Sequence, residues 1–168
     1  MPELPDVESF KNYLDSTSLH QKIIGVTVKS KKILDGISAP KLTDLLEENS
    51  FQNTRRYGKH LLLEVSKDLW VTMHFGLTGS LKYFENAEDI NRYTQVMFSF
   101  ENGRHLAYIS RRMLDRVGIA ASPDEYIKKH GLGKDALEIT EDQFKSVIIK
   151  KHHCQIGADG PVENSRNR

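Results

Sequence analysis

The chain has 168 residues, of which 38% are hydrophobic and 28% are charged, and its formal net charge is +1. It contains no apolar run long enough to cross a bilayer, which excludes a membrane-spanning helix. A single cysteine excludes an internal disulfide bond, and the near-neutral total charge gives no general sign of nucleic-acid binding. The length suits one domain with a substantial hydrophobic core.

The first fifty residues predict two helices and one strand. A short amphipathic helix after Pro5 is predicted from apolar residues at helical spacing, namely Val7, Phe10 and Leu14. A half-buried strand is predicted from alternating apolar residues, namely Ile24, Val26 and Val28. A second helix should begin at Pro40, with an apolar face made of Leu42, Leu45 and Leu46.

From Phe51 to Ala120 the pattern is almost entirely that of β-structure. Apolar residues alternate in four runs: Leu61–Val65, Trp70–His74, Val96–Phe100 and His105–Ile109. Between the last two runs, Asn102 and Gly103 predict a hairpin, because both residue types accept the positive φ of tight turns.

Two further helices are predicted after the strands. Ser122-Pro123 is an N-cap followed by a proline in the first turn, and Gly131 is placed to end that helix. Thr140 and Gln143 form a capping box before the apolar residues of the last helix. Many short strands with helices at both ends predict a mainly β, α+β fold: an antiparallel two-layer β-sandwich with flanking helices.

The residues after Met1 carry the most specific chemistry. If Met1 is removed, Pro2 becomes an N-terminal secondary amine, with the carboxylate of Glu3 beside it. An α-amino group titrates near pH ~8, so a useful fraction is neutral and nucleophilic at neutral pH. Such an amine can form a covalent iminium with a carbon that carries a nitrogen leaving group. The alternative is that Pro2 merely follows the initiator methionine.

The basic residues are clustered although the total charge is small. Three groups stand out, at Lys29, Lys31 and Lys32, at Arg55, Arg56 and Lys59, and at Arg111, Arg112 and Arg116. Such groups are either solvated faces or the electrostatic footprint of a nucleic-acid surface.

Four segments, in this order, carry a resemblance to a known family. They are residues 2–8 (PELPDVE), 55–63 (RRYGKHLLL), 73–81 (MHFGLTGSL) and 106–117 (LAYISRRMLDRV). The chain resembles the formamidopyrimidine-DNA glycosylase and endonuclease VIII family of base-excision repair enzymes. The resemblance implies that residues 1–156 form the family's N-terminal catalytic domain. It stops there, before the family's helix-two-turns-helix and zinc-finger parts, and the polar residues 157–168 are predicted to be a disordered tail.

The resemblance also implies roles for individual residues. Pro2 would be the nucleophile that displaces the damaged base and permits strand cleavage by β- and δ-elimination, and Glu3 would transfer protons. Lys59 and His74 would contact phosphate, with Lys59 also aiding the chemistry. Asp6 and Glu8 match carboxylates at the mouth of the site, although acids in a first helical turn are also favoured by the helix dipole.

Base flipping requires side chains that fill the vacated stack. By alignment these are Leu77, Arg112 and Leu114, and a slip of one residue would give Arg111 the role of Arg112. Leu114 stands where the family has an aromatic ring, Ser110 where it has Asp, and Asp115 where it has Gly. The segment 106–117 is therefore the one that departs most from the family pattern.

The resemblance implies a bifunctional DNA glycosylase and AP lyase, acting on double-stranded DNA with damaged bases or abasic sites and impaired by the missing half. The alternatives are a non-catalytic DNA-binding or partner-binding module and an inactive remnant. No cofactor and no metal are expected, because Cys154 beside His152 and His153 is a poor zinc site. With no targeting segment at the start, we expect a cytoplasmic, nucleoid-associated protein.

The last predicted helix has more apolar surface than one inward face needs. Its apolar residues are Phe144, Val147, Ile148 and Ile149. We expect this surface to be covered in a homodimer, or by the helix folding back onto the sandwich. Lesion preference and the removal of Met1 are not readable from the sequence.

Overall fold

The computed structural model describes residues 1–86 and 89–156, with side chains as far as Ile149 apart from the same gap. It divides into two compact units, Met1–Leu132 and Gly133–Arg168. The predicted tail, residues 157–168, lies outside the described residues. Among the described helices, none is both long enough and apolar enough to cross a membrane.

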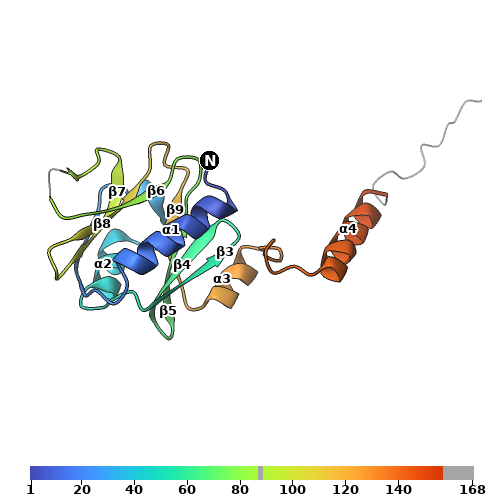
Figure 1. Ribbon diagram of the computed structural model, residues 1–168, viewed down its shortest axis with the longest axis horizontal. Helices are drawn as coiled ribbons and strands as arrows, with labels where there is room; N and C mark the ends of the chain where they lie inside the picture. Colours follow the sequence, from blue (N-terminus) through green and yellow to red (C-terminus); the bar gives the residue numbers. More distant parts are fainter. Residues whose placement is uncertain (87–88, 157–168) are drawn as a thin grey trace, which may run out of the picture. The chain divides into compact units, whose positions relative to one another are not determined.

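The first unit is a β-sandwich of two sheets (Figure 1). The four-stranded sheet has the order β1-β7-β8-β6, with β1 at Ile23–Val28, β6 at Ser80–Phe84, β7 at Thr94–Phe100 and β8 at His105–Ile109. The five-stranded sheet has the order β2-β9-β5-β4-β3, with β2 at Leu34–Asp35, β3 at Asn53–Tyr57, β4 at His60–Ser66, β5 at Leu69–His74 and β9 at Arg116–Ala120. The predicted α+β sandwich is thereby confirmed.

Two details of the strands differ from the prediction. The strand pairs are antiparallel except for β2, which pairs in parallel with β9. In β1, Ile24 is 52% exposed whereas Ile23 is fully buried, so the prediction of Ile24 as an inward residue was wrong. The cause is a register shift against β7 between Ile23 and Gly25, because a β-bulge changes which side chains face the core.

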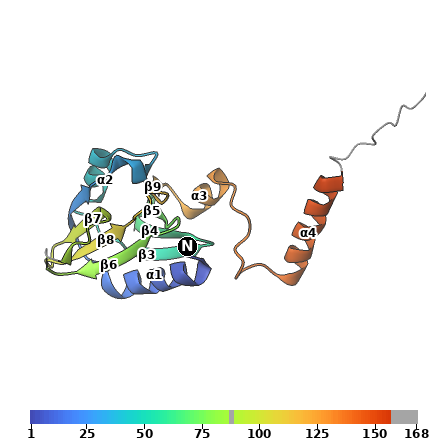
Figure 2. The ribbon, with the colours of Figure 1, turned by 90° about the horizontal axis from the view of Figure 1, so that it is seen from above.

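Helices close the two open sides of the sandwich. Helix α1 (Leu4–Thr17) packs along β3 and β6, which are edge strands of the two sheets, and α2 (Ala39–Leu46) packs against β1 at the other side (Figure 2). A short 3-10 helix, η1 (Lys31–Ile33), precedes β2. Both α-helices have a proline in the first turn, where its missing N–H costs no hydrogen bond.

An aromatic contact fixes the first half of α1. Val7 and Leu14 of α1 are fully buried in the main core. Between them, the ring of Phe10 lies 4.6 Å from the ring of Phe75, which in turn stacks on Tyr108 at 5.4 Å. Because Phe75 directly follows β5, this contact holds the start of α1 over the turn at residues 75–79.

A second, smaller core lies on the outer face of the five-stranded sheet. Leu62 and Trp70 pack there against Tyr126 of α3 (Pro123–Lys129), a helix capped by the hydroxyl of Ser122 as predicted. Nδ1 of His60 is 3.0 Å from the hydroxyl of Tyr126, so this histidine is held in the same contact. In the second unit, helix α4 spans Glu141–Ile156, and the predicted capping box of Thr140 and Gln143 is present.

The pKa of His60 predicts acid sensitivity of the fold. Burial, followed by the charges of His74 and His130, lowers the pKa of His60 to about 4. The folded state thus keeps His60 neutral while the unfolded chain binds a proton near pH ~6.5, so stability is lost as the pH falls from there toward 4. We expect a loss of about 2 kcal/mol at pH 5, which His60→Gln removes. Urea unfolding at pH 7.5 and pH 5 measures it.

The matched control is His20→Gln, which removes an exposed histidine. It should leave the difference in unfolding free energy between the two pH values as in the parent chain. An equal pH dependence in the parent chain and in His60→Gln would contradict the assignment.

Candidate functional site

The N-terminus and the tip of a hairpin meet in an ion pair. Strands β3 and β4 are joined by a tight turn in which Gly58 has φ +55°, and Lys59 follows it. Nζ of Lys59 lies 2.6 Å from Oε2 of Glu3, the residue that caps α1. Both side chains remain partly exposed, so their charged ends face solvent beside Pro2.

Pro2 borders an open hollow of about 290 Å³. Its wall is made by the chain start, by α1 and by the turn after β5: Met1, Pro2, Asp6, Phe10, Leu77, Thr78 and Gly79. Pro2 and Leu77, far apart in the sequence, therefore share one concave surface. Met1 is 65% exposed at its rim.

Asp6 and Glu8, the two carboxylates predicted at the mouth of the site, have different contacts. Asp6 lines the hollow and also accepts the backbone N–H of Glu3 at 2.8 Å, which caps the helix. Glu8 accepts a hydrogen bond from Nε of Arg56 at 2.6 Å, and the Arg56 side chain is only 7% exposed. Glu8 is thus an anchor between α1 and β3, and removing it would leave a buried guanidinium without this carboxylate.

His74 ends β5, opposite His60 on one side and Arg116 on the other. Burial lowers the pKa of His74; the charge of Asp115 opposes this, while Lys59 and Arg116 add to it. His74 thus lies at the end of β5 between two basic neighbours, and its role in contacting phosphate remains a prediction.

The Thr78 hydroxyl joins the two loops that carry the side chains predicted to fill the vacated base stack. The backbone N–H groups of Arg111 and Arg112 donate to the Thr78 hydroxyl at 3.2 and 3.3 Å. Both arginines are exposed, as is Leu114, which has 53% of its surface open. Leu77 is instead half-buried in the hollow. The β8–β9 loop thus projects its side chains outward while its backbone is fixed to the turn.

Gly76 and Asp115 approach each other closely where these loops meet. A Cβ on Gly76, at φ +47°, would lie 2.1 Å from Oδ1 of Asp115 and 2.9 Å from the backbone of Leu114. Asp115 is fully buried, and within the described residues neither of its carboxylate oxygens has hydrogen-bond geometry to a partner. Burial raises the pKa of Asp115, and the nearby Ser110 hydroxyl, His74 and Arg116 oppose that rise.

The structure brings together Pro2, Glu3, Lys59, Asp6 and Leu77, whereas Leu114 stands out in solvent. Sequence reasoning missed Thr78 and the ring contact of Phe10. Thr78 carries no signal in the sequence, because its role depends on a loop 33 residues further along the chain. The sequence predicted Phe10 as an apolar residue of the helix, but it did not identify Phe75 as the ring that Phe10 contacts.

Comparison with known proteins shows the family to which this chain is related. The model of the formamidopyrimidine-DNA glycosylase N-terminal domain matches residues 1–117. The chain belongs to the formamidopyrimidine-DNA glycosylase family. The match covers the sandwich as far as β9 and includes all the predicted site residues.

Curated relatives extend this match beyond residue 117. A formamidopyrimidine-DNA glycosylase of Wolbachia sp. subsp. Brugia malayi is 28% identical over 151 residues, 90% of this chain and 54% of the relative. One of Moorella thermoacetica is 31% identical over 124 residues, 74% of this chain and 45% of the relative. The chain spans about half the length of the curated relatives it matches.

Solved structures confirm the fold. A Lactococcus lactis Fpg in complex with abasic-site DNA has a TM-score of 0.70 and 21% identity, covering 77% of this chain and 47% of that one. A MutM in complex with DNA containing carbocyclic 8-oxo-G has a TM-score of 0.73 and 21% identity, covering 79% and 49%. Both share the fold of this chain over the part that they cover.

No group of three or more His, Cys, Asp or Glu side chains suited to a metal ion occurs among the described side chains. The side chains of His152, His153 and Cys154 lie outside that description. The expectation that this family member needs no metal therefore remains a prediction.

The close packing at Gly76 gives a direct prediction. Gly76→Ala should lower the free energy of unfolding by about 3 kcal/mol, because the new methyl adds a clash to the left-handed conformation. Gly103→Ala is the matched control: Gly103 has φ +80° but open space around its Cβ position, so it should cost only about 1 kcal/mol. Equal losses in urea unfolding of the two variants would contradict this packing.

Proposed function

We propose that this chain is a DNA glycosylase with AP lyase activity, in which Pro2 is the nucleophile. The observation that supports it most is the meeting of Pro2, Glu3 and Lys59 beside one hollow. Three groups suited to nucleophilic attack, proton transfer and phosphate binding lie within reach of one bound nucleotide. The substrate class follows from the family, whose base-excision repair role fits DNA in the nucleoid.

The proposed reaction starts from the Pro2 amine after removal of Met1. Its nitrogen gives up its proton and attacks C1′ of the damaged nucleoside, the bond from C1′ to the base breaks, and the base leaves with a proton. The bond from C1′ to O4′ then breaks, O4′ takes up a proton, and the opened sugar is joined to Pro2 as an iminium. Glu3 transfers that proton and later takes one from C2′, which allows β-elimination of the 3′ phosphate. A second elimination releases the 5′ phosphate, and water then frees the amine.

Lys59 and His74 support this chemistry through the DNA backbone. The Lys59 ammonium is a flexible point charge at a hairpin tip, and a phosphate entering beside the lesion would share it with Glu3. Leu77 would fill the vacated stack from the wall of the hollow, and Arg112 or Arg111 would contact the unpaired opposite base. Leu114 would supply a smaller apolar surface than an aromatic ring.

Trapping with sodium borohydride on DNA that contains an abasic site tests the proposal. The parent chain should give a covalent adduct, because borohydride reduces the iminium of Pro2 to a stable amine. Pro2→Gly should lower the yield by at least about 10²-fold. Intact mass must first show that Met1 has been removed, since a retained Met1 blocks the amine.

The matched control is Pro40→Gly, which makes the same change in the first turn of α2 and should leave the adduct unchanged. No adduct from the demethionylated parent chain, together with measurable DNA binding, would contradict the enzyme and support the alternative of a non-catalytic binding module. Neither adduct nor binding would indicate an inactive remnant.

We also propose that the protein forms a homodimer through α4. The apolar side chains of this helix are exposed in the second unit, with Phe144 at 53%, Val147 at 44%, Ile148 at 43% and Ile149 at 59%. Monomers seldom leave such a surface open, and a two-fold contact between copies would cover it.

Sedimentation equilibrium measures this association. Ile148→Lys should shift the parent dimer toward monomer by at least about tenfold in dissociation constant, because it places a charge in an apolar contact. Ser146→Lys adds the same charge on a polar position of α4 and is the control. A parent chain that remains monomeric at every concentration would contradict the proposal.

A further inference from the structure

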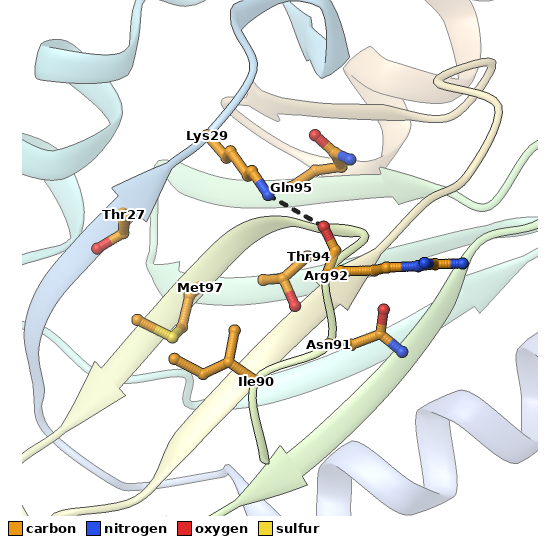
Figure 3. Close-up of a pocket in the computed structure, with 8 residues that line it drawn as sticks. All are labelled: Thr27, Lys29, Ile90, Asn91, Arg92, Thr94, Gln95 and Met97. Atoms are coloured by element: carbon orange, nitrogen blue, oxygen red, sulfur yellow. Dashed lines mark hydrogen bonds between the residues drawn. The ribbon is translucent and has the colours of Figure 1, made fainter. Parts of the chain in front are cut away.

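Three loops are fastened together beside the candidate site: residues 29–33 after β1, residues 90–93 before β7, and residues 110–115 between β8 and β9. Nζ of Lys29 donates to the backbone carbonyl of Arg92 at 3.0 Å, and both residues line a second hollow of about 270 Å³, distinct from the one at Pro2 and shown in Figure 3. The Ser30 hydroxyl donates to Sδ of Met113 at 3.7 Å, which joins the first loop to the third.

The second and third loops are joined through the backbone of Tyr93. Its carbonyl accepts the N–H of Ser110 at 3.0 Å. The Gln95 side chain, 4% exposed, donates both to this carbonyl at 3.2 Å and to the Ser110 carbonyl at 3.0 Å. These bonds use backbone groups and a buried amide, so they fix the loops without using their arginine side chains.

Two guanidinium groups lie near the ring of Tyr93. Cζ of Arg92 lies 4.6 Å from the ring centroid and Cζ of Arg111 lies 5.1 Å from it. In Figure 3 the Arg92 side chain extends away from the second hollow, while its carbonyl turns back toward Lys29. Two like charges are thus held at one aromatic platform in spite of their mutual repulsion.

The three loops present one sign of charge. Six basic residues lie in the loops, and a seventh, Arg116, is the first residue of β9. The six are Lys29, Lys31, Lys32, Arg92, Arg111 and Arg112. The only acid in the three loops is Asp115, which is fully buried. Within these three ranges no acidic side chain therefore faces solvent. Glu85 and Asp89, earlier in the connection between β6 and β7, are exposed and pair with Arg104 and Lys82.

We infer that these loops form a second contact surface, which binds the backbone phosphates of duplex DNA beside the nucleotide in the hollow. It continues from the candidate site, because Arg111 and Arg112 are fixed through their N–H groups to Thr78 in the wall of that hollow. The inference rests on the proposed function only for the choice of DNA as the partner. The loops hold their cations at set positions, which suits a regularly spaced polyanion.

Binding to an undamaged duplex isolates this surface from the chemistry. Each phosphate contact contributes about 0.9 to the slope of log Kd against log salt concentration. The double variant Lys29→Ala/Arg92→Ala should lower the slope by about 2 and weaken binding equally for unrelated sequences. Lys67→Ala, at the exposed β4–β5 turn on the other end of β5, is the control and should change the slope by less than one contact.

Tyr93 supplies a second test. Tyr93→Phe keeps the ring and should bind as the parent chain does. Tyr93→Leu removes the platform and also part of the packing on Phe84 and Ile109, and it should weaken binding several-fold at a temperature at which both variants are folded. An unchanged salt slope in the double variant, or no binding of the parent chain to duplex at low salt, would overturn the inference. Equal losses of duplex and polyglutamate binding would overturn the assignment to DNA. An altered slope without a borohydride adduct would refute the proposed chemistry alone.

Discussion

The contact of Phe75 with Phe10 and Tyr108 is the interaction on which the site depends. Chain termini fray unless they are fastened, and the nucleophile proposed at residue 2 would be useful only if it is held still. Phe75 is 1% exposed and joins α1 of the N-terminus to Tyr108 of the four-stranded sheet. The Tyr108 hydroxyl in turn donates to the carbonyl of His74 at 2.8 Å. One aromatic row thus positions the chain start, the turn and the end of β5.

Charged contacts around this row divide into anchors and exposed pairs. Arg56 is buried and bonds both Glu8 and the carbonyl of Gly58, so it ties α1 to the hairpin that carries Lys59. The Glu3–Lys59 pair is exposed, and such pairs contribute only about 0–1 kcal/mol to stability. Its geometry therefore matters more for where the two groups lie than for holding the fold together.

The loops near the site are ordered through short polar groups. Thr78 and Gln95 bind backbone groups of the loop at residues 110–115, and the Ser110 hydroxyl accepts the N–H of Met113 within that loop. Such bonds leave the long basic side chains exposed on the outer surface. Asp115 is buried, and burial raises the pKa of its carboxyl because an ionised carboxylate is unfavourable away from water. It packs closely against Gly76 of the other loop.

The sequence by itself determined the local elements. Alternating apolar runs, the turn residues Asn102-Gly103, and the caps at Ser122 and Thr140 all appear in the structure, because period and turn chemistry are encoded within a few residues. The ordered motifs also placed the chain in its family. The roles of Pro2, Glu3 and the other site residues stay predictions.

Only the tertiary structure decided which elements meet. A bulge, which no periodicity shows, turned Ile24 outward. Thr78 binds a loop more than thirty residues away, Arg92 and Arg111 share the ring of Tyr93, and Asp115 lies buried against Gly76. These contacts depend on how two sheets pack and on where loops cross. That information is spread over distant residues, and no short segment contains it.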